Sequence, residues 1–132
     1  MMEGTVSSSL QPLLPLKIYA PTDMGLEVIA LIDTGFSGCL TLPIEEIKAM
    51  ELAFDRRETY TVGDNEDVLF ELYTGAKVRW HKSEKDVVVM AVDGEAVLGM
   101  ELMRDSRLMV EAKIGGRVQI STLEQDTETT EA

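Results

Sequence analysis

The stretch Ile29–Leu42, IALIDTGFSGCLTL, decides how the rest of the sequence is interpreted. Four apolar residues lead into Asp33, and Gly35 and Gly38 allow the chain to turn sharply after it. A carboxylate at the end of an apolar strand is costly unless its ionised form is hydrogen-bonded or shares a proton. Since Gly35 has no side chain, its N–H and a ligand can both approach the carboxylate closely. We therefore predict a strand, a tight turn and a functional aspartate.

The tripeptide Asp33-Thr34-Gly35 is weak evidence when taken alone. At average residue usage it occurs by chance in roughly 2% of chains of this length. A plain turn is enough to explain such an occurrence. Its meaning therefore depends on the sequence around it.

The composition excludes several classes of function. The chain has 132 residues, a common size for one domain. Its 24 acidic and 12 basic residues give a net charge of −12, so nucleic acid and anionic membranes are poor partners. One Cys and one His exclude a disulfide framework and a zinc site built from these residues. We expect chemistry based on carboxylates, hydroxyls or backbone groups, with no metal and no cofactor.

Three segments are expected along the chain. Residues 1–12 are predicted to be a flexible N-terminal segment, and residues 13–120 the folded domain. Residues 121–132 contain four acids and no base, so they cannot bury enough apolar surface to become ordered, and we predict a disordered acidic tail. No signal peptide and no stretch of ~18 apolar residues is found, and we expect a cytoplasmic protein.

Period-two alternation and short apolar runs predict strands over most of the domain. Leu14–Ala20 alternates, Leu26–Ile32 indicates a buried central strand, and Thr59–Leu72 indicates a hairpin. Pro43 and the acids after it predict a short helix, and Met100–Arg104 predicts one or two helical turns. Because strands do not alternate with helices, we predict an all-β, closed barrel-like fold with one or two short helices.

The segment IALIDTGFSG resembles the active-site signature of the aspartic peptidases, in which apolar residues lead into Asp-Thr-Gly. Ala96–Leu102, AVLGMEL, resembles the second element of that family, an apolar-apolar-Gly motif followed by a helix. Leu108–Ile120 resembles the terminal strands of its small members. Matching segments run from Leu13 to Ile120, and the chain is similar to the retropepsin-like single-domain clan AA aspartic proteases of bacteria and archaea.

This resemblance implies an aspartic endopeptidase that acts on a peptide or protein substrate. Two-lobed members carry two Asp-Thr/Ser-Gly motifs in one chain, whereas this chain has one. The implied active unit is therefore a homodimer in which Asp33 of each chain meets on a two-fold axis. The two carboxylates would share a proton, one acting as a base on water while the other polarises the scissile carbonyl.

The same resemblance implies roles for several other residues. Thr34 would donate across the axis to the partner chain, and Gly35 would approach the carboxylates from behind. The hairpin Thr59–Leu72 would be a flap that closes over substrate. The implied residues at the flap tip are Val62, Gly63, Asp64 and Asn65. The residues implied to brace the active-site loop are Val97, Leu98 and Gly99.

Three features depart from the family pattern. Phe36 stands where many members have Ser, Thr or Ala, so no hydroxyl there can bond the outer carboxylate oxygen, and Ser37 is a candidate replacement one residue later. The tip Val62–Asp67 contains three acids where relatives tend to be less charged. In retropepsins the terminal strands form a sheet between the subunits. The candidates for these strands in this sequence are Leu13–Ala20 and Arg117–Ile120.

Other interpretations of these residues remain open. A retropepsin-like dimer that binds peptides, or only dimerises, has the same fold, and Phe36 with the acidic flap tip favours it. The intact Asp-Thr-Gly motif opposes it. Cys39 and His81 could form a thiol peptidase pair, although Cys39 has the surroundings of a small buried hydrophobe. Ser37 fits a serine-hydrolase elbow poorly, because the motif's last glycine is replaced by Cys39.

Overall fold

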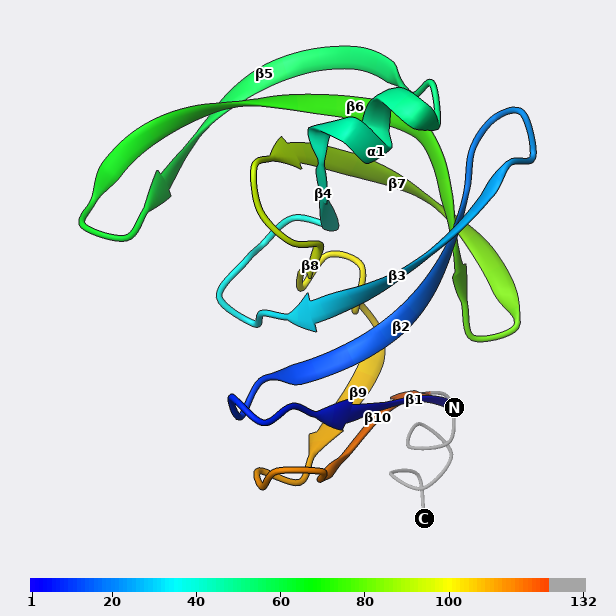
Figure 1. Cartoon of the computed structure of the whole chain (residues 1–132), viewed down its shortest axis with the longest axis vertical. Helices are drawn as coiled ribbons and strands as arrows, with labels where there is room; N and C mark the ends of the chain where they lie inside the picture. Colours follow the sequence, from blue (N-terminus) through cyan, green and yellow to red (C-terminus); the bar gives the residue numbers. More distant parts are fainter. Residues whose placement is uncertain (124–132) are drawn as a thin grey trace.

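Figure 1 shows the computed structural model, which describes residues 1–123. Within this range the chain forms ten strands and one short helix, α1 (Ile44–Ala49). The strands are β1 (Met2–Val6), β2 (Pro12–Tyr19), β3 (Gly25–Ile32), β4 (Leu40–Pro43), β5 (Ala53–Val62), β6 (Glu66–Trp80), β7 (Ser83–Val92), β8 (Val97–Leu98), β9 (Ser106–Val110) and β10 (Arg117–Thr122). The predicted all-β class is confirmed.

The strands belong to one sheet that closes on itself. Their order is β5-β6-β7-β4-β8-β3-β2-β1-β10-β9, and an additional pairing joins β6 to β2. The run from β6 to β2 is thereby closed into a barrel, as predicted, and its strands have no open edges. β5 remains outside the ring at one end of the order, and β1, β10 and β9 remain outside it at the other.

Alternating apolar residues build the barrel core. The buried residues of β2 are Leu14, Leu16 and Ile18, and those of β3 are Val28, Ala30 and Ile32. The prediction that Leu26–Ile32 is buried throughout is wrong for one face, since Ile29 is 62% exposed. Successive side chains of a strand point to opposite faces, and only the inner face of β3 contributes to the core.

One of the two predicted helical segments is helical. α1 follows Pro43 and has Glu45 and Glu46 in its first turn, where negative charge is favourable. Residues 100–105 form turns instead of the predicted helix over Met100–Arg104. Asp105 has a positive φ of 63°, which reverses the chain into β9 before a helix can develop.

The N-terminal segment is ordered, and the prediction that residues 1–12 are flexible is wrong. β1 pairs with β10 along Met2–Thr5 and with β2 at Thr5 and Val6. Backbone hydrogen bonds on both sides stabilise this segment, and composition does not reveal them. At the other end, Ser121 and Thr122 extend β10. Residues 124–132 of the predicted tail lie outside the described residues.

β1 approaches β2 so closely that position 4 must be glycine. A Cβ at Gly4 would lie 1.9 Å from the carbonyl oxygen of Leu13. We predict that Gly4→Ala lowers the free energy of unfolding by about 1–3 kcal/mol, the usual cost of overpacking, in urea denaturation. Gly94→Ala is the matched control, because nothing lies within 4 Å of its added Cβ. Equal stability of the two variants would contradict a firmly paired β1.

Glu111 and Arg117 hold the turn between β9 and β10. The guanidinium donates to the carboxylate at 3.1 and 3.0 Å, and the backbone N–H of Arg117 donates to it at 2.9 Å. These contacts lower the pKa of Glu111 to about 2. A lowered carboxyl pKa stabilises the fold above the pKa of the unfolded chain, and the contribution is lost as the pH falls toward the folded-state value.

We predict that Glu111→Gln lowers the urea midpoint at neutral pH. The difference from wild type should shrink as the pH falls from 4.5 toward about 2, because Glu111 then becomes protonated in the wild-type protein as well. Urea titrations at several pH values measure this difference. A difference that stays constant over the whole range would show that the ionised pair does not contribute.

Candidate active site

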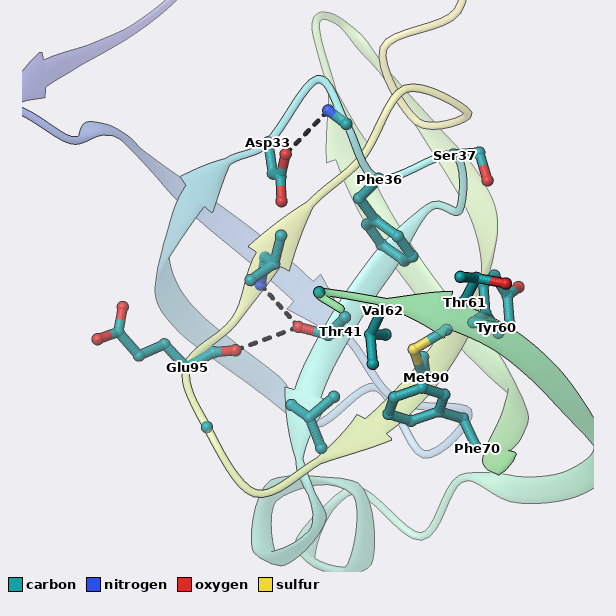
Figure 2. A pocket seen from close by; sticks show the side chains of 15 residues that line it. Asp33, Phe36, Ser37, Thr41, Tyr60, Thr61, Val62, Phe70, Met90 and Glu95 are labelled. Carbon is teal, nitrogen blue, oxygen red and sulfur yellow. Dashed lines mark hydrogen bonds between the residues drawn. The ribbon is translucent and has the colours of Figure 1, made fainter. Parts of the chain in front are cut away.

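Asp33 lies directly after β3, where the chain leaves the barrel wall (Figure 2). Its N–H donates to the carbonyl of Leu98 at 3.0 Å, and its own carbonyl accepts the N–H of Phe36 at 3.1 Å. The N–H of Gly35 donates to the carboxylate at 2.8 Å. Asp33 and Thr34 are exposed. The loop therefore presents a carboxylate at the surface and holds it in a tight turn.

Three backbone N–H groups support this loop from behind. Gly99 donates to Cys39 at 2.9 Å, Met100 to Phe36 at 2.8 Å and Glu101 to Gly38 at 3.1 Å, each to the carbonyl oxygen. The close approach requires a glycine, because a Cβ at position 99 would lie 2.2 Å from the carbonyl oxygen of Gly38. The position of the loop is thus determined mainly by backbone hydrogen bonds.

β8 completes the support. Val97 and Leu98 pair in parallel with β3 and antiparallel with β4, so this motif lies directly against the strand that carries the aspartate. Val97, Leu98 and Gly99 are the residues that the family resemblance implies as the brace of this loop. Sequence reasoning missed Met100 and Glu101, because they contribute only backbone N–H groups, which every residue except proline has.

Thr41 is a buried polar residue that sequence reasoning did not select. It is 6% exposed, and its hydroxyl donates to the carbonyl of Glu95 at 3.1 Å (Figure 2). The same hydroxyl accepts the N–H of Val97 at 2.9 Å. It therefore joins β4 to the segment that enters β8. A hydroxyl inside the apolar run Leu40–Pro43 was the available signal, since buried polar groups are almost always hydrogen-bonded.

A cavity of about 680 Å³ opens beside Asp33 and extends under the β5–β6 hairpin. Its apolar lining includes Phe36, Val62, Phe70, Met90 and Val92. Asp33 and Glu95 are the charged residues of the lining, and the side chain of Glu95 points outward in Figure 2. Apolar walls around a few polar groups are typical of a ligand cleft.

The β5–β6 hairpin forms a long arm that extends beyond the barrel (Figure 1). The last pair of its ladder is Val62 with Glu66, and the turn between them includes Gly63 and Asn65, both with positive φ. The residues of this arm that line the cleft are Tyr60, Thr61, Val62, Gly63 and Phe70. Asp64 and Asn65 lie at the tip and are not among the lining residues.

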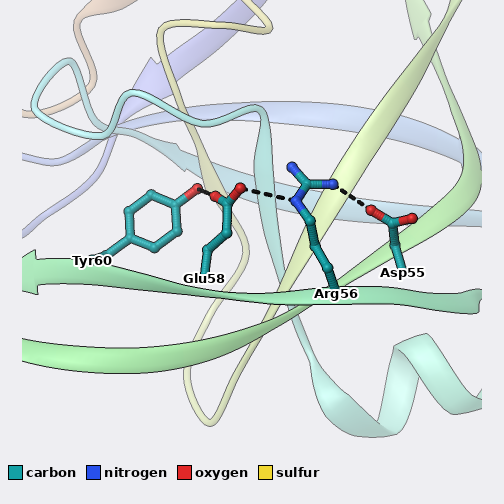
Figure 3. Close-up of polar contacts among 4 residues, drawn as sticks. All are labelled: Asp55, Arg56, Glu58 and Tyr60. Atoms are coloured by element: carbon teal, nitrogen blue, oxygen red, sulfur yellow. Dashed lines mark hydrogen bonds and ion pairs between the residues drawn. The ribbon is translucent and has the colours of Figure 1, made fainter.

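A chain of polar contacts follows one face of β5 (Figure 3). The hydroxyl of Tyr60 donates to Glu58 at 3.1 Å, and Nε of Arg56 donates to Glu58 at 2.9 Å and pairs with Asp55 through its guanidinium. The hydrogen bond from Arg56 lowers the pKa of Glu58, while burial and the Glu58 carboxylate raise the pKa of Tyr60. The hydrogen bond to Glu58 therefore holds the Tyr60 hydroxyl at the cleft wall.

Phe36 occupies the position where a hydroxyl was expected from the family pattern. Its ring packs over two glycines, since a Cβ at Gly38 or Gly99 would lie 2.6 or 2.5 Å from ring carbons. Phe36 and Ser37 line both the cleft and a smaller cavity of about 250 Å³. Among residues 1–123 no hydroxyl is hydrogen-bonded to Asp33, so Ser37 does not replace the missing group in this structure.

The proposed thiol pair gains no support from the structure. Burial raises the pKa of Cys39, although a hydrogen bond with the Val88 backbone acts in the opposite direction. A raised pKa disfavours the nucleophilic thiolate. His81 lies in the turn between β6 and β7, with Nε2 3.4 Å from the hydroxyl of Ser106. Within the described part of the chain, no group of three or more His, Cys, Asp or Glu could hold a metal ion.

None of the helical structure in residues 1–123 is long and apolar enough to span a membrane.

Comparisons with known proteins identify the fold. No protein-family model and no curated protein matches the sequence. A retropepsin-like aspartic protease from Rickettsia conorii is 16% identical with a TM-score of 0.53, covering 91% of this chain and 93% of that chain. EIAV protease, complexed with the inhibitor HBY-793, is 16% identical with a TM-score of 0.52, covering 72% and 86%. The chain therefore has the retropepsin-like fold.

Thr41 offers a test of how the loop is supported. We predict that Thr41→Val, which keeps the shape but removes the hydroxyl, lowers the free energy of unfolding by about 1–3 kcal/mol, since it leaves the half-buried N–H of Val97 without its acceptor. Urea denaturation measures the loss. Thr41→Ser keeps the hydroxyl and is the control that should lose less. If the two variants are equally destabilised, the hydroxyl does not contribute as described.

Proposed function

We propose that two copies of this retropepsin-like chain together form an aspartic endopeptidase whose dyad consists of one Asp33 from each copy. The observation that carries the proposal is the exposed carboxylate of Asp33, held by the Gly35 N–H beside an apolar cleft. The fold is that of known proteases, and the Asp-Thr-Gly motif lies in the loop between β3 and β4.

A second copy is needed because one chain supplies half of such a site. The sequence contains one Asp-Thr-Gly motif. Glu95 is the other acid that lines the cleft, and its side chain points outward in Figure 2. Asp33 and Thr34 are exposed, so the same loop of a second copy can approach them. Two-fold symmetry brings identical residues together at the axis.

The proposed chemistry follows from two carboxylates placed side by side. They cannot both ionise cheaply, so the pair holds one proton between them. The ionised member removes a proton from a water molecule, whose oxygen attacks the scissile carbonyl carbon, while the protonated member donates to the carbonyl oxygen. The C–N bond then breaks as the leaving amine takes a proton. This reaction requires no metal and no cofactor.

The surrounding residues have proposed roles in binding and orientation. Thr34 donates to the partner's loop and fixes the two aspartates relative to each other. Val62 and Gly63, which line the cleft from the flap, bind the backbone of an extended peptide, as exposed strand edges commonly do. Asp64 and Asn65 remain in solvent at the tip. We also propose a cytoplasmic location, which suits the unpaired thiol of Cys39.

One observation favours a second function, a peptide-binding dimer that does not cleave. No hydroxyl within residues 1–123 is hydrogen-bonded to Asp33, and Phe36 occupies the position expected to supply one. The acids at the flap tip also repel each other when two flaps close together. The intact Asp-Thr-Gly loop, with its complete backbone support, favours the enzyme.

We predict that Asp33→Asn reduces cleavage of a mixed peptide library by about 10²–10⁴-fold between acidic and neutral pH, because an amide cannot act as base or acid. Sedimentation should show that the variant is still a dimer. Asp93→Asn is the matched control, since Asp93 is exposed and does not line the cleft, and its activity should equal that of wild type.

Two results would contradict the proposed enzyme. Equal cleavage by wild type and Asp33→Asn would show that the aspartate is not catalytic. A wild-type dimer that binds library peptides without cutting them would establish the binding module instead.

A further inference from the structure

We propose that the two copies meet through one end of the sheet, where three loops lie next to each other, with Leu10 and Ile114 as the apolar contacts. We call this surface the turn rim and define it as residues 7–11, 33–34 and 111–116. The inference rests on the proposed homodimer and specifies the surface that forms it.

Strand register brings the three loops of the turn rim together. Leu13 pairs with Leu31, which places Gln11 level with Asp33 at the end of the β2–β3 ladder. The N–H of Ser7 donates to Gln11 at 2.9 Å, and Val6 exchanges hydrogen bonds of 2.9 Å with residues 115 and 116. The loops therefore follow one another across the ends of neighbouring strands. All three lie on the left side of Figure 1.

The turn rim exposes two large aliphatic side chains. Leu10 is 61% exposed and Ile114 is 67% exposed, each at the tip of a turn. Exposed aliphatic groups next to a site that needs a second copy are suited to burial between the copies. Leu10 lies in the loop that enters β2, the neighbour of the strand that leads to Asp33, and Ile114 lies in the loop that enters β10, two strands further along the sheet. A partner that buries both side chains therefore also lies along the strand ends that include the aspartate loop.

The turn that carries Leu10 holds it in an unfavourable backbone conformation. Leu10 has a φ of 60°, a region that a leucine rarely adopts. The hydroxyl of Ser7 accepts the N–H groups of Ser9 and Gln11 at 3.2 Å, and the carbonyl of Ser7 accepts the N–H of Leu10 at 3.0 Å. Strain maintained by such a network is more common at functional positions than elsewhere.

Charge identifies a second copy as the occupant. With a net charge of −12, two chains repel each other unless their contact surfaces are poor in acids. Gly4–Leu16 contains no charged residue. In the third loop Glu111 is paired with Arg117, and Lys113 is basic. Apart from Asp33 itself, the acid of the turn rim is Glu111, which is paired, so the turn rim is a surface that two acidic chains can bring together.

The strands predicted to form a sheet between the two copies are already paired within one chain. β2, which contains most of Leu13–Ala20, is paired with β3 on one side and on the other with β1 at its start and β6 at its end. β10, which contains Arg117–Ile120, is paired with β1 and β9. A strand that is paired on both sides has no edge for a partner strand. Contact through side chains of the turn rim remains available.

The test is sedimentation of full-length Leu10→Asp and Ile114→Asp over a range of protein concentrations. We expect wild type to dimerise and each variant to raise the dimer dissociation constant by about tenfold or more, as truncating a central apolar contact does. Met24→Asp is the matched control and should dimerise like wild type. Met24 is 41% exposed in the turn at the opposite end of β2 and β3.

Leu10→Gly keeps the inference testable if the charged variants fold poorly. Glycine relieves the positive φ, so this variant should be at least as stable to urea as wild type, yet its dimer should be weaker. If none of the three variants changes the dissociation constant of the dimer, the turn rim is not the interface, whereas the proposed enzyme is unaffected. A wild-type chain that remains monomeric at every concentration would overturn both.

Discussion

The hydrogen bonds between the aspartate loop and residues 97–101 are the constraint on which the rest of the site depends. They connect two segments that are sixty or more residues apart in the sequence, and the loop carbonyls face backbone N–H groups. Each such bond contributes modestly, but an unpaired carbonyl here would be costly. The close approach requires Gly99, and β8 adds a ladder on both sides. The carboxylate of Asp33 is therefore positioned by the barrel itself.

Much of this arrangement could be predicted from short patterns. Apolar residues that end in Asp-Thr-Gly predicted a strand and a tight turn in the places where the structure has them. The later Val-Leu-Gly motif, selected by family resemblance, lies against that strand. Period-two alternation predicted which face of β2 is buried. These predictions succeed because local sequence determines turns and strand faces.

Other features could not be predicted, and the reasons are physical. β1 is ordered by pairing with β2 and β10, and pairing between distant strands leaves no trace in the composition of Met2–Val6. Ile29 is exposed although its strand is almost wholly apolar, because burial depends on what covers each face. The N–H groups of Met100 and Glu101 support the loop irrespective of side chain. Thr41 had a signal, a hydroxyl in an apolar run, but its partners are fixed only by the folded chain.

The proposed mechanism explains why a chain with an apolar cleft beside its aspartate would still need a partner. One copy contains the apolar cavity, the hairpin residues Val62 and Gly63 that line it, and the supported loop. Glu95 is the acid that lines this cavity together with Asp33, and its side chain points outward in Figure 2. Ordinary dyad chemistry requires two carboxylates that share a proton. In the proposed mechanism the cleft binds the peptide, the loop positions Asp33, and association of two chains creates the catalytic pair.

The most direct measurement of that central claim mixes wild type with increasing amounts of Asp33→Asn at constant total protein, under conditions where chains exchange between dimers. If each site needs Asp33 from both copies, peptide cleavage falls with the square of the wild-type fraction. Cleavage that falls in simple proportion to the wild-type fraction would show that one chain holds a complete site, and would contradict the account.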